Sequence, residues 1–406
     1  MFFKMALRNI WKNRRRSIAT ISAVAVGYMG LALFAGYIES TRAGLAEQSI
    51  IGERLGHLTL VKSGYFSAGK IDPEKFIFSN DEIATLKQEL NGDKDIELIS
   101  PRLDLSGLVS NGRVSTIYTT EGISAEDLVK LRGKYADLPG KLDPSNPAAT
   151  AMGEELATIL GLKQGETAVI TGTTASGLMN ALDIEVGEVF NTGSAGTNDK
   201  FILMSLDLAQ RLYDVQGAHR IVLKLADKAM TESKRKELEE KLASRGMPIE
   251  IKTWNELSMF YNQVMGMLES MFGFLFMLVM VVVGMSIFNT MGMSVMERTR
   301  EIGTLRSLGM QRGEVVKLFR VEGMLLAIVG CLLGMVMTAA NTLSAELMNV
   351  TYVPPGSTEA VPLSFLHLPE NIVFYFGILV LIGMSASWVP AEKAAKMPVV
   401  DALGHV

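Results

Sequence analysis

The stretch SMFGFLFMLVMVVVGMSIFNTMGMSVM, residues 270–296, runs for 27 residues without Asp, Glu, Lys or Arg. A helix needs about 20 apolar residues to cross the hydrocarbon core of a bilayer. This stretch is therefore a predicted membrane span, and three other uncharged windows match it at 17–38, 323–345 and 371–391. The mean hydropathy of +0.25 for the 406-residue chain reflects these windows. They exclude a purely soluble enzyme, and also a membrane β-barrel, whose spans are short and alternating.

Positive charge predicts the orientation of the spans. Residues 1–16 carry six basic residues and no acid, and residues 297–322 carry six more. The tail 392–406 adds Lys393 and Lys396, whereas the loop 346–370 has no Lys or Arg. Basic loops remain on the cytoplasmic side of a membrane. We therefore expect both termini and residues 297–322 inside, and the loop outside.

The long segment 39–269 holds 34 acidic and 25 basic residues, and the four-span topology places it outside. Its patterns predict a mixed α and β domain with two subdomains and a stalk leading into the second span. Strand-like runs lie at 57–61, 114–118, 168–171, 200–204 and 221–225; helical runs lie at 81–90, 154–160, 206–213 and 231–245. The Gly-, Thr-, Ser- and Asn-rich stretch 172–198 predicts long hairpin loops. The fold class is thus a four-helix membrane protein with a large extracytoplasmic α+β domain between helices one and two.

Residues 1–16 begin with an amphipathic pattern. Phe3, Leu7, Ile10 and Trp11 share one helical face, and basic side chains occupy another. This pattern is typical of a helix that lies on the inner leaflet.

The segment ERTREIGTLRSLG, residues 297–309, follows the second span directly. Ile302, Leu305 and Leu308 recur at three-residue spacing, and Gly309 is a plausible helix stop. A short helix of this kind suits a groove on a partner, or contact with lipid headgroups only. The candidate coupling residues are Glu297, Arg298, Arg300, Glu301, Ile302, Gly303, Leu305, Arg306, Leu308 and Gly309.

The apolar windows contain two further candidate surfaces. Phe272, Phe276, Met277 and Met280 in the methionine-rich second span could face lipid or an acyl chain, or could pack against other helices. Small residues allow helices to approach closely. Gly330 and Gly334 are therefore candidates for helix packing, within the chain or in a dimer.

The residue inventory argues against several chemistries. The single cysteine, Cys331, excludes an intramolecular disulfide, and the four histidines show no metal-ligand spacing. We expect no catalytic residue, no metal and no cofactor on this chain. The windows hold no ionisable residue, which argues against an ion pathway through the membrane.

Residues 297–309 closely resemble the permease core of the MacB/FtsX/LolC–LolE superfamily of ABC transporters. The resemblance continues through Val315, Leu318, Phe319, Glu322 and GCLLG at 330–334. The tail PAEKAAKMP at 390–398 and the start ALRNIWKNRRR at 6–16 are similar to the same family. The segments GHLTL at 56–60 and GYF at 64–66 are similar to its lipoprotein-releasing members.

The resemblance implies a mechanotransmission machine in the bacterial inner membrane. Two permeases, two copies of this chain or this chain with a paralogue, would pair with a cytoplasmic ABC ATPase dimer that holds ATP and Mg²⁺. Residues 297–309 would seat on the ATPase, so this chain would not be an enzyme. Substrate would be handled on the periplasmic side, with a chaperone or adaptor there and lipids around the spans. No nucleic-acid partner is expected.

Several functions fit this outline. Lipoprotein release toward the outer membrane is the first choice. Export of peptides, drugs or other amphiphiles with a periplasmic adaptor is the main alternative, and regulation of cell-wall hydrolases is another. A membrane-anchored sensor or scaffold belongs to a different class, and an enzyme with an outer catalytic domain lacks a supporting motif.

Overall fold

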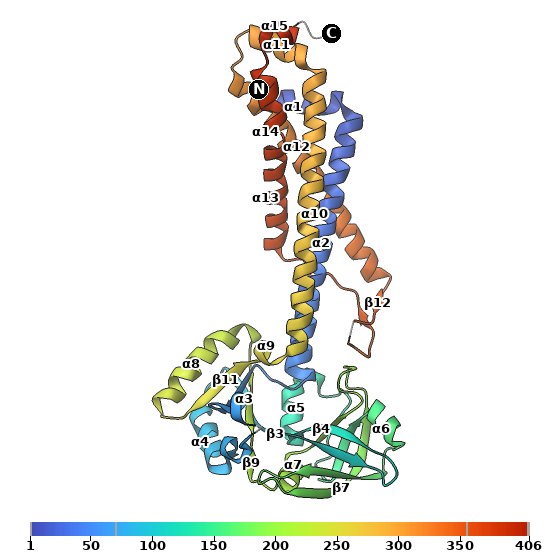
Figure 1. Cartoon of the computed structure of the whole chain (residues 1–406), viewed down its shortest axis with the longest axis vertical. Helices are drawn as coiled ribbons and strands as arrows, with labels where there is room; N and C mark the ends of the chain where they lie inside the picture. Colours follow the sequence, from blue (N-terminus) through green and yellow to red (C-terminus); the bar gives the residue numbers. More distant parts are fainter. Residues whose placement is uncertain (1, 70, 355, 404–406) are drawn as a thin grey trace. The chain divides into compact units, whose positions relative to one another are not determined.

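The computed structural model describes residues 2–69, 71–354 and 356–403. Four helices are long and apolar enough to cross a membrane: α2 (Arg14–Glu47), α10 (Met259–Glu297), α12 (Arg312–Leu347) and α13 (Pro369–Ala386), which α14 (Trp388–Lys396) extends (Figure 1). A large α/β domain is inserted between the first and the second of them. The predicted fold class is confirmed. By compactness the chain forms two units, a helical unit and a β domain, and each is described by itself.

The helical unit comprises Met1–Ala43, Gln263–Thr351 and Pro362–Val406. All four long helices contribute to its core, with side chains such as Tyr28, Val283, Phe319 and Leu379. These side chains are almost fully buried, so the core is continuous across the four helices.

Glycines set the closest helix contacts in this unit. A Cβ on Gly330 would lie 2.5 Å from Val24 Cβ, and one on Gly334 would lie 2.9 Å from Tyr28 Cβ. Both glycines of α12 therefore pack against α2 of the same chain. A Cβ on Gly383 of α13 would lie 2.8 Å from Ala327 Cβ of α12, a crossing that the sequence patterns did not reveal.

Short helices gather at one end of the helical unit (Figure 1). They are α1 (Phe2–Lys12), α11 (Thr299–Ser307), α14 and α15 (Val399–Leu403). Ala6 of α1 is fully buried against Leu318 and Leu325 of α12, while Leu7 and Trp11 are exposed. The helix α1 thus has an apolar outer face as well as a packed one.

The β domain comprises Gly44–Asn262 and Tyr352–Val361. Six of its strands close into a barrel, because the sixth pairs back onto the first. In spatial order they are β3 (Ile96–Ser110), β4 (Ser115–Ile123), β8 (Phe201–Ser205), β5 (Ala149–Gly153), β7 (Met179–Phe190) and β6 (Thr167–Thr173). The helices α6 (Glu154–Leu160) and α7 (Leu206–Tyr213) share the apolar core of the barrel.

A second layer extends from the long strand β3. The sheet continues as β3, β10 (Arg220–Leu225), β1 (Leu58–Lys62) and β11 (Ile249–Thr253). The helices α4 (Asn80–Leu90) and α8 (Thr231–Ser244) pack their apolar side chains onto this sheet, for example Leu86 and Leu238. The predicted strand at 221–225 and helix at 231–245 are β10 and α8, and β1 lies between β10 and the following strand β11 in the sheet.

The stretch 172–198 differs from its prediction. It contains the 12-residue strand β7, because Ile184, Val186 and Phe190 alternate toward buried positions. Polar residues such as Asn180, Asp183 and Glu188, together with Gly187, interrupt the apolar positions of this strand and hide the alternation.

Shorter elements complete the chain. They are the π-helical turn Gln48–Gly52, α3 (Tyr65–Ala68), Pro73–Phe76 (3-10), β2 (Phe78–Ser79), α5 (Ala125–Arg132), Gly133–Tyr135 (3-10), β9 (Gly217–Ala218), Lys228–Met230 (3-10), α9 (Trp254–Leu257), β12 (Thr351–Tyr352) and β13 (Val361–Pro362).

The loop that joins α12 to α13 is anchored in the β domain. The Ala195 N–H donates to the Gly356 carbonyl oxygen at 3.0 Å, and Thr358 Oγ1 donates to Asn191 Oδ1 at 2.5 Å. Ser194 and Ser357 form an isolated antiparallel bridge between them. Residues Tyr352–Val361 of this connection are therefore part of the β-domain fold.

Candidate functional site

The candidate site is the short helix α11, which begins where α10 ends. Arg298 separates the two helices, with a non-helical φ of −113°. The helix ends at Ser307, and Gly309 has a φ of +102°, a conformation that favours glycine. The predicted helix and its glycine stop are confirmed.

A buried ion pair anchors α11 to α12. Arg298 Nη1 lies 3.3 Å from Glu322 Oε2, and both side chains are less than 10% exposed. Arg298 Nε also donates to Glu301 Oε2 at 3.1 Å, and its guanidinium lies over the Phe319 ring at 5.6 Å. From α1, Asn9 Nδ2 donates to Glu322 Oε2 at 3.4 Å. Breaking a buried pair leaves an uncompensated charge, so these contacts fix where α11 begins.

Exposed contacts surround this anchor. Lys12 Nζ of α1 lies 2.9 Å from Glu301 Oε1, and Arg16 Nη1 lies 2.6 Å from Glu297 Oε1. The hydrogen bonds from Lys12 and Arg298 hold the pKa of the Glu301 carboxyl below its usual value. Arg306 donates to the Met397 carbonyl oxygen after α14. The start of α11 is thus tied to α1 and α12, and its last turn is tied to the segment after α14.

The outer surface of α11 differs from the predicted stripe. Ile302 is only 5% exposed and belongs to the core of the helical unit, and Gly303 is buried too. Leu305 is half-buried, whereas Leu308 is 80% exposed and Arg300 is exposed. Because α11 ends at Ser307, Leu308 leaves the helical face that Ile302 shares with the core. Leu308 is therefore the exposed apolar residue of the segment, beside polar residues such as Arg300, Thr304 and Ser307, with Leu305 at its margin.

The candidate surface on the second span, formed by Phe272, Phe276, Met277 and Met280, is exposed only in part. Phe272 stacks on Phe34 of α2, with ring centroids 6.0 Å apart, and lies 5.8 Å from the Tyr375 ring of α13. Phe276 and Met280 are partly buried against the same core. Met277 alone among the four is mostly exposed, at 67%. Three of these side chains thus pack within the chain, and Met277 faces outward.

The i,i+3 spacing of Arg298 and Glu301 predicts their ion pair, which the structure confirms, but sequence reasoning missed Glu322 as the buried partner of Arg298 and the contacts of Asn9 with Glu322 and of Lys12 with Glu301. Asn9, Lys12 and Glu322 lie far from α11 in the sequence, and no local pattern joins them. Glu322 stands immediately before an uncharged window, and that acid at the edge of a span was the available signal. Among the described residues, no group of His, Cys, Asp and Glu could hold a metal ion.

This architecture defines a class of protein: a multi-span membrane protein with one large domain after its first span and an anchored short helix after its second. Comparison with known families identifies the class further. Residues 17–241 match the MacB-like periplasmic core domain, and residues 273–399 match the FtsX-like permease C-terminal family. The first match alone covers more than half of the chain. The chain belongs to the MacB/FtsX family of ABC transporter permeases.

Individual relatives agree with this assignment. The Macrolide export ATP-binding/permease protein MacB of Neisseria gonorrhoeae is 28% identical over 52% of this chain and 32% of its own length. The protein of the same name from Shewanella sp. (strain ANA-3) is 31% identical over 31% of this chain and 18% of its own length. The chain thus matches less than a third of these longer relatives. The periplasmic region of MacB from Actinobacillus actinomycetemcomitans aligns with 53% of this chain and 95% of that structure, at 13% identity and a TM-score of 0.37.

Proposed function

We propose that this chain is the membrane subunit that couples ATP hydrolysis by a separate cytoplasmic ATPase to movement of the β domain on the outer side of the bacterial inner membrane. The observation that carries the proposal is α11, whose start is fixed by the buried Arg298–Glu322 pair and which exposes Arg300 in its first turn and Leu308 just past its end. A short helix that is fixed to the fold and exposes an apolar side chain at its end can transmit force from a partner groove to α10 and α12.

The proposal is tested at exposed Leu308, because a substitution at buried Ile302 would also disrupt the core of the helical unit. We expect Leu308→Asp to abolish co-purification of the ATPase while the permease keeps its melting temperature. The matched control is Leu178→Asp, since Leu178 is also largely exposed, at 68%, but lies in the β domain. ATPase binding that survives Leu308→Asp would contradict the proposed coupling role. A sensor or scaffold without an ATPase would then be the better account.

The exposed face of α10 supports a paired permease. Only 17% of the apolar window of α10 is buried, against 39% for α2 and 44% for α12. Phe274, Met277 and Val281 are each more than half exposed on this helix. We propose that a second permease, a copy or a paralogue, covers this face, with lipid on the remainder. The pair would present two α11 helices to an ATPase dimer that holds ATP and Mg²⁺.

Two kinds of transported cargo are compatible with this role. Lipoprotein release is supported by the similarity of segments 56–60 and 64–66 to lipoprotein-releasing members. Export of a drug or another amphiphile is supported by the names of the curated relatives, which are macrolide export proteins. Reconstitution in proteoliposomes distinguishes the two. A lipoprotein-releasing complex would transfer an acylated lipoprotein to a periplasmic chaperone in an ATP-dependent way. An exporter would not release lipoproteins, and an amphiphilic drug with an adaptor would stimulate its ATPase activity.

A further inference from the structure

The helix α1 carries apolar side chains that the rest of the helical unit does not cover. Phe3, Leu7 and Trp11 follow one another at four-residue spacing, so they form one row along the helix. Their exposed fractions are 57%, 46% and 76%. Ala6 and Asn9 lie on another side of the helix and are buried against α12. The helix is therefore attached to the fold by one side and presents an apolar row on another.

Three arginines beside this row have no partner. Arg8 follows Leu7 in α1, and Arg14 and Arg15 begin α2. All three side chains are exposed. None of them forms an ion pair or a hydrogen bond with any residue that the structure describes. Arg8, Arg14 and Arg15 are called the unpaired arginines below.

Other basic residues of the same segment are neutralised. Lys12 lies 2.9 Å from Glu301 and Arg16 lies 2.6 Å from Glu297, both close to the start of α11. The basic side chains that reach α11 thus have carboxylate partners there. The unpaired arginines are left over for a partner outside the chain.

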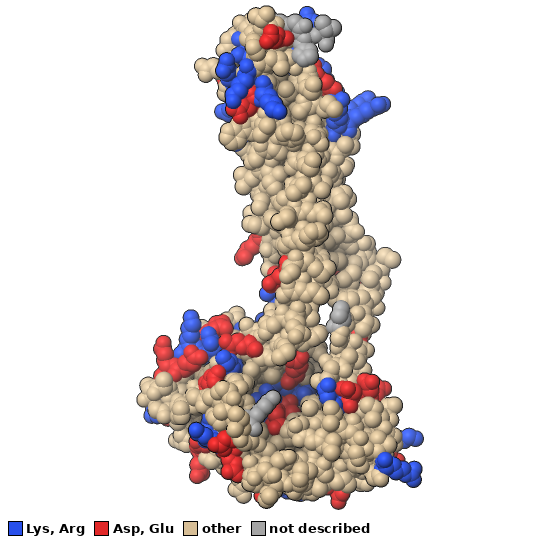
Figure 2. All heavy atoms as spheres, in the orientation of Figure 1, with Lys and Arg blue, Asp and Glu red and all other residues tan. Residues whose placement is uncertain are grey.

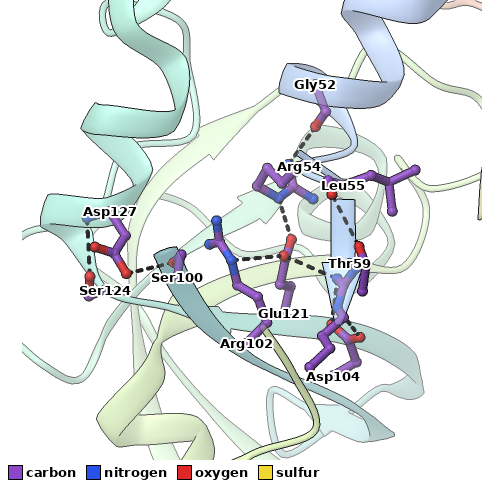
Figure 3. Close-up of polar contacts among 11 residues, drawn as sticks. Gly52, Arg54, Leu55, Thr59, Ser100, Arg102, Asp104, Glu121, Ser124 and Asp127 are labelled. Carbon is purple, nitrogen blue, oxygen red and sulfur yellow. Dashed lines mark hydrogen bonds and ion pairs between the residues drawn. The ribbon is translucent and has the colours of Figure 1, made fainter. Parts of the chain in front are cut away.

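Arginines of the β domain are paired even where they are crowded. Arg54 Nε lies 2.5 Å from Glu121 Oε2, and Arg102 lies 3.8 Å from the same carboxylate (Figure 3). Arg220 lies 3.2 Å from it as well. Three guanidinium groups therefore share one buried carboxylate. The unpaired arginines differ from this pattern, because none of the carboxylates in the described part of the chain pairs with them.

Two of the unpaired arginines also oppose the dipole of their own helix. Arg14 and Arg15 stand in the first turn of α2, which contains no acidic residue. The N-terminus of a helix carries a partial positive charge, so basic side chains there are unfavourable and anions are favourable. Phosphate groups are common partners of such helix ends. The stability of α2 therefore does not account for these two arginines, whereas an anion beside them would.

This end of the helical unit has the features of a membrane–water interface. Figure 2 shows charged side chains at the end of the unit, next to a broad belt without them. Two of the three tryptophans of the chain lie here, Trp11 in α1 and Trp388 in α14, and both are more than half exposed. Tryptophan is enriched at membrane interfaces, at the level of the lipid headgroups. The unpaired arginines thus lie where lipid phosphates are within reach.

We propose that α1 and the start of α2 bind anionic phospholipids, with Arg8, Arg14 and Arg15 on the phosphate groups and Phe3, Leu7 and Trp11 among the acyl chains. A basic row beside an apolar row matches the two parts of such a lipid. A soluble protein in this place would instead keep Trp11 away from lipid. The proposal requires that the chain spans a membrane, and it does not rest on the ATPase or on the cargo.

Fluorescence quenching by brominated lipids tests the proposal on the full-length chain. Trp254→Phe and Trp388→Phe leave Trp11 as the single tryptophan. The protein is placed in nanodiscs with equal amounts of phosphatidylglycerol and phosphatidylcholine, one of which is brominated near the top of its acyl chains. We expect brominated phosphatidylglycerol to quench Trp11 more strongly, because each basic side chain near an anionic surface favours it about fivefold. High salt should reduce this preference.

Charge variants identify the residues responsible. Replacing all three unpaired arginines with glutamine should make the two lipids quench equally, whereas replacing them with lysine should keep the preference. These side chains are exposed and unpaired, so the fold loses no contact. The matched control Arg113→Gln/Lys163→Gln/Lys236→Gln removes three exposed charges from the β domain and should keep the preference too.

Three results would overturn the proposal. The first is equal quenching by the two lipids in the protein with all its arginines. The second is a preference that the glutamine variant retains or that the β-domain control loses. The third is no quenching by either lipid, which would place Trp11 outside the acyl region and favour a soluble partner on α1.

Discussion

Arg298 and Glu322 form a buried ion pair, 3.3 Å between Nη1 and Oε2, that joins the start of α11 to α12. The pair stands 24 residues apart in the sequence and places a charged contact at the edge of an apolar helix. It fixes the start of α11 to the fold, while Leu308, just past the end of α11, stays 80% exposed and available to a partner.

Removing one member of this ion pair should lower the stability of the protein more than removing both members. Glu322→Ala leaves the Arg298 guanidinium buried without its main partner, a defect that typically costs about 3–5 kcal/mol. The double variant Arg298→Met/Glu322→Leu removes both charges and should recover most of that loss. Thermal unfolding in detergent measures both proteins. A double variant that is less stable than Glu322→Ala would contradict this account of the anchor.

The contact of α12 with α2 should not tolerate a methyl group at Gly330. A Cβ there would meet Val24 and the Ile21 backbone, and overpacking of this kind costs about 1–3 kcal/mol. Gly330→Ala should therefore lower the melting temperature and the yield of monodisperse protein. Gly377→Ala on α13 is the control, because a Cβ at that position meets nothing within 4 Å. Equal melting temperatures and yields of the two variants would contradict a tightly packed contact at Gly330.

The stability of the β domain should fall as the pH falls from about 6.5 to about 4. Burial lowers the pKa of His57 to about 4 from 6.5, and burial also lowers the pKa of His219. The unfolded chain binds more protons in this range, so acid favours unfolding, by about 3 kcal/mol for His57 once the pH is below both values. His57→Gln should flatten this dependence, since glutamine can still accept the hydrogen bond from the Leu225 N–H.

The measurement follows unfolding by Trp254 fluorescence after Trp11→Phe and Trp388→Phe. Trp254 packs on Ala46 and Ile50 within the β domain and reports on that domain. A pH dependence that is identical in the His57→Gln variant would rule out His57 as its source.

The loop between α12 and α13 should be held against the β domain in the working protein. The backbones of Ser194 and Ser357 form a bridge, so the double variant Ser194→Cys/Ser357→Cys should form a disulfide under mild oxidation. The native Cys331 is fully buried and should not interfere. Ser244→Cys/Ser357→Cys is the control, because Ser244 ends α8 in the other layer of the domain. Equal cross-linking in both pairs would indicate that the loop is not held in place.

The sequence was most informative where a pattern is local. Helices at 154–160 and 206–213 were predicted with their observed bounds, and the short helix with its glycine stop after the second span was predicted too. The packing role of Gly330 and Gly334 also follows from residue size alone. Local rules succeed here because neighbouring residues share one turn or one face.

Long-range pairings could not be read in the same way. The Asn9–Glu322 contact joins residues 313 positions apart, and the barrel closes through pairing of β3 with β6. Arg102 and Glu121 sit inside strands as charged residues, and only the fold shows that they compensate each other. The burial of Ile302 is another such case. The apolar spacing of Ile302, Leu305 and Leu308 is compatible with binding to a partner and also with packing in the protein's own core.

Native mass spectrometry of the chain, extracted gently from its own membrane, tests the central proposal most directly. We predict a complex of two permease chains with two ATPase subunits, and the same spectrum would identify the second permease and any bound cargo. A chain that appears without an ATPase, under conditions that preserve other membrane complexes, would contradict the coupling role of α11.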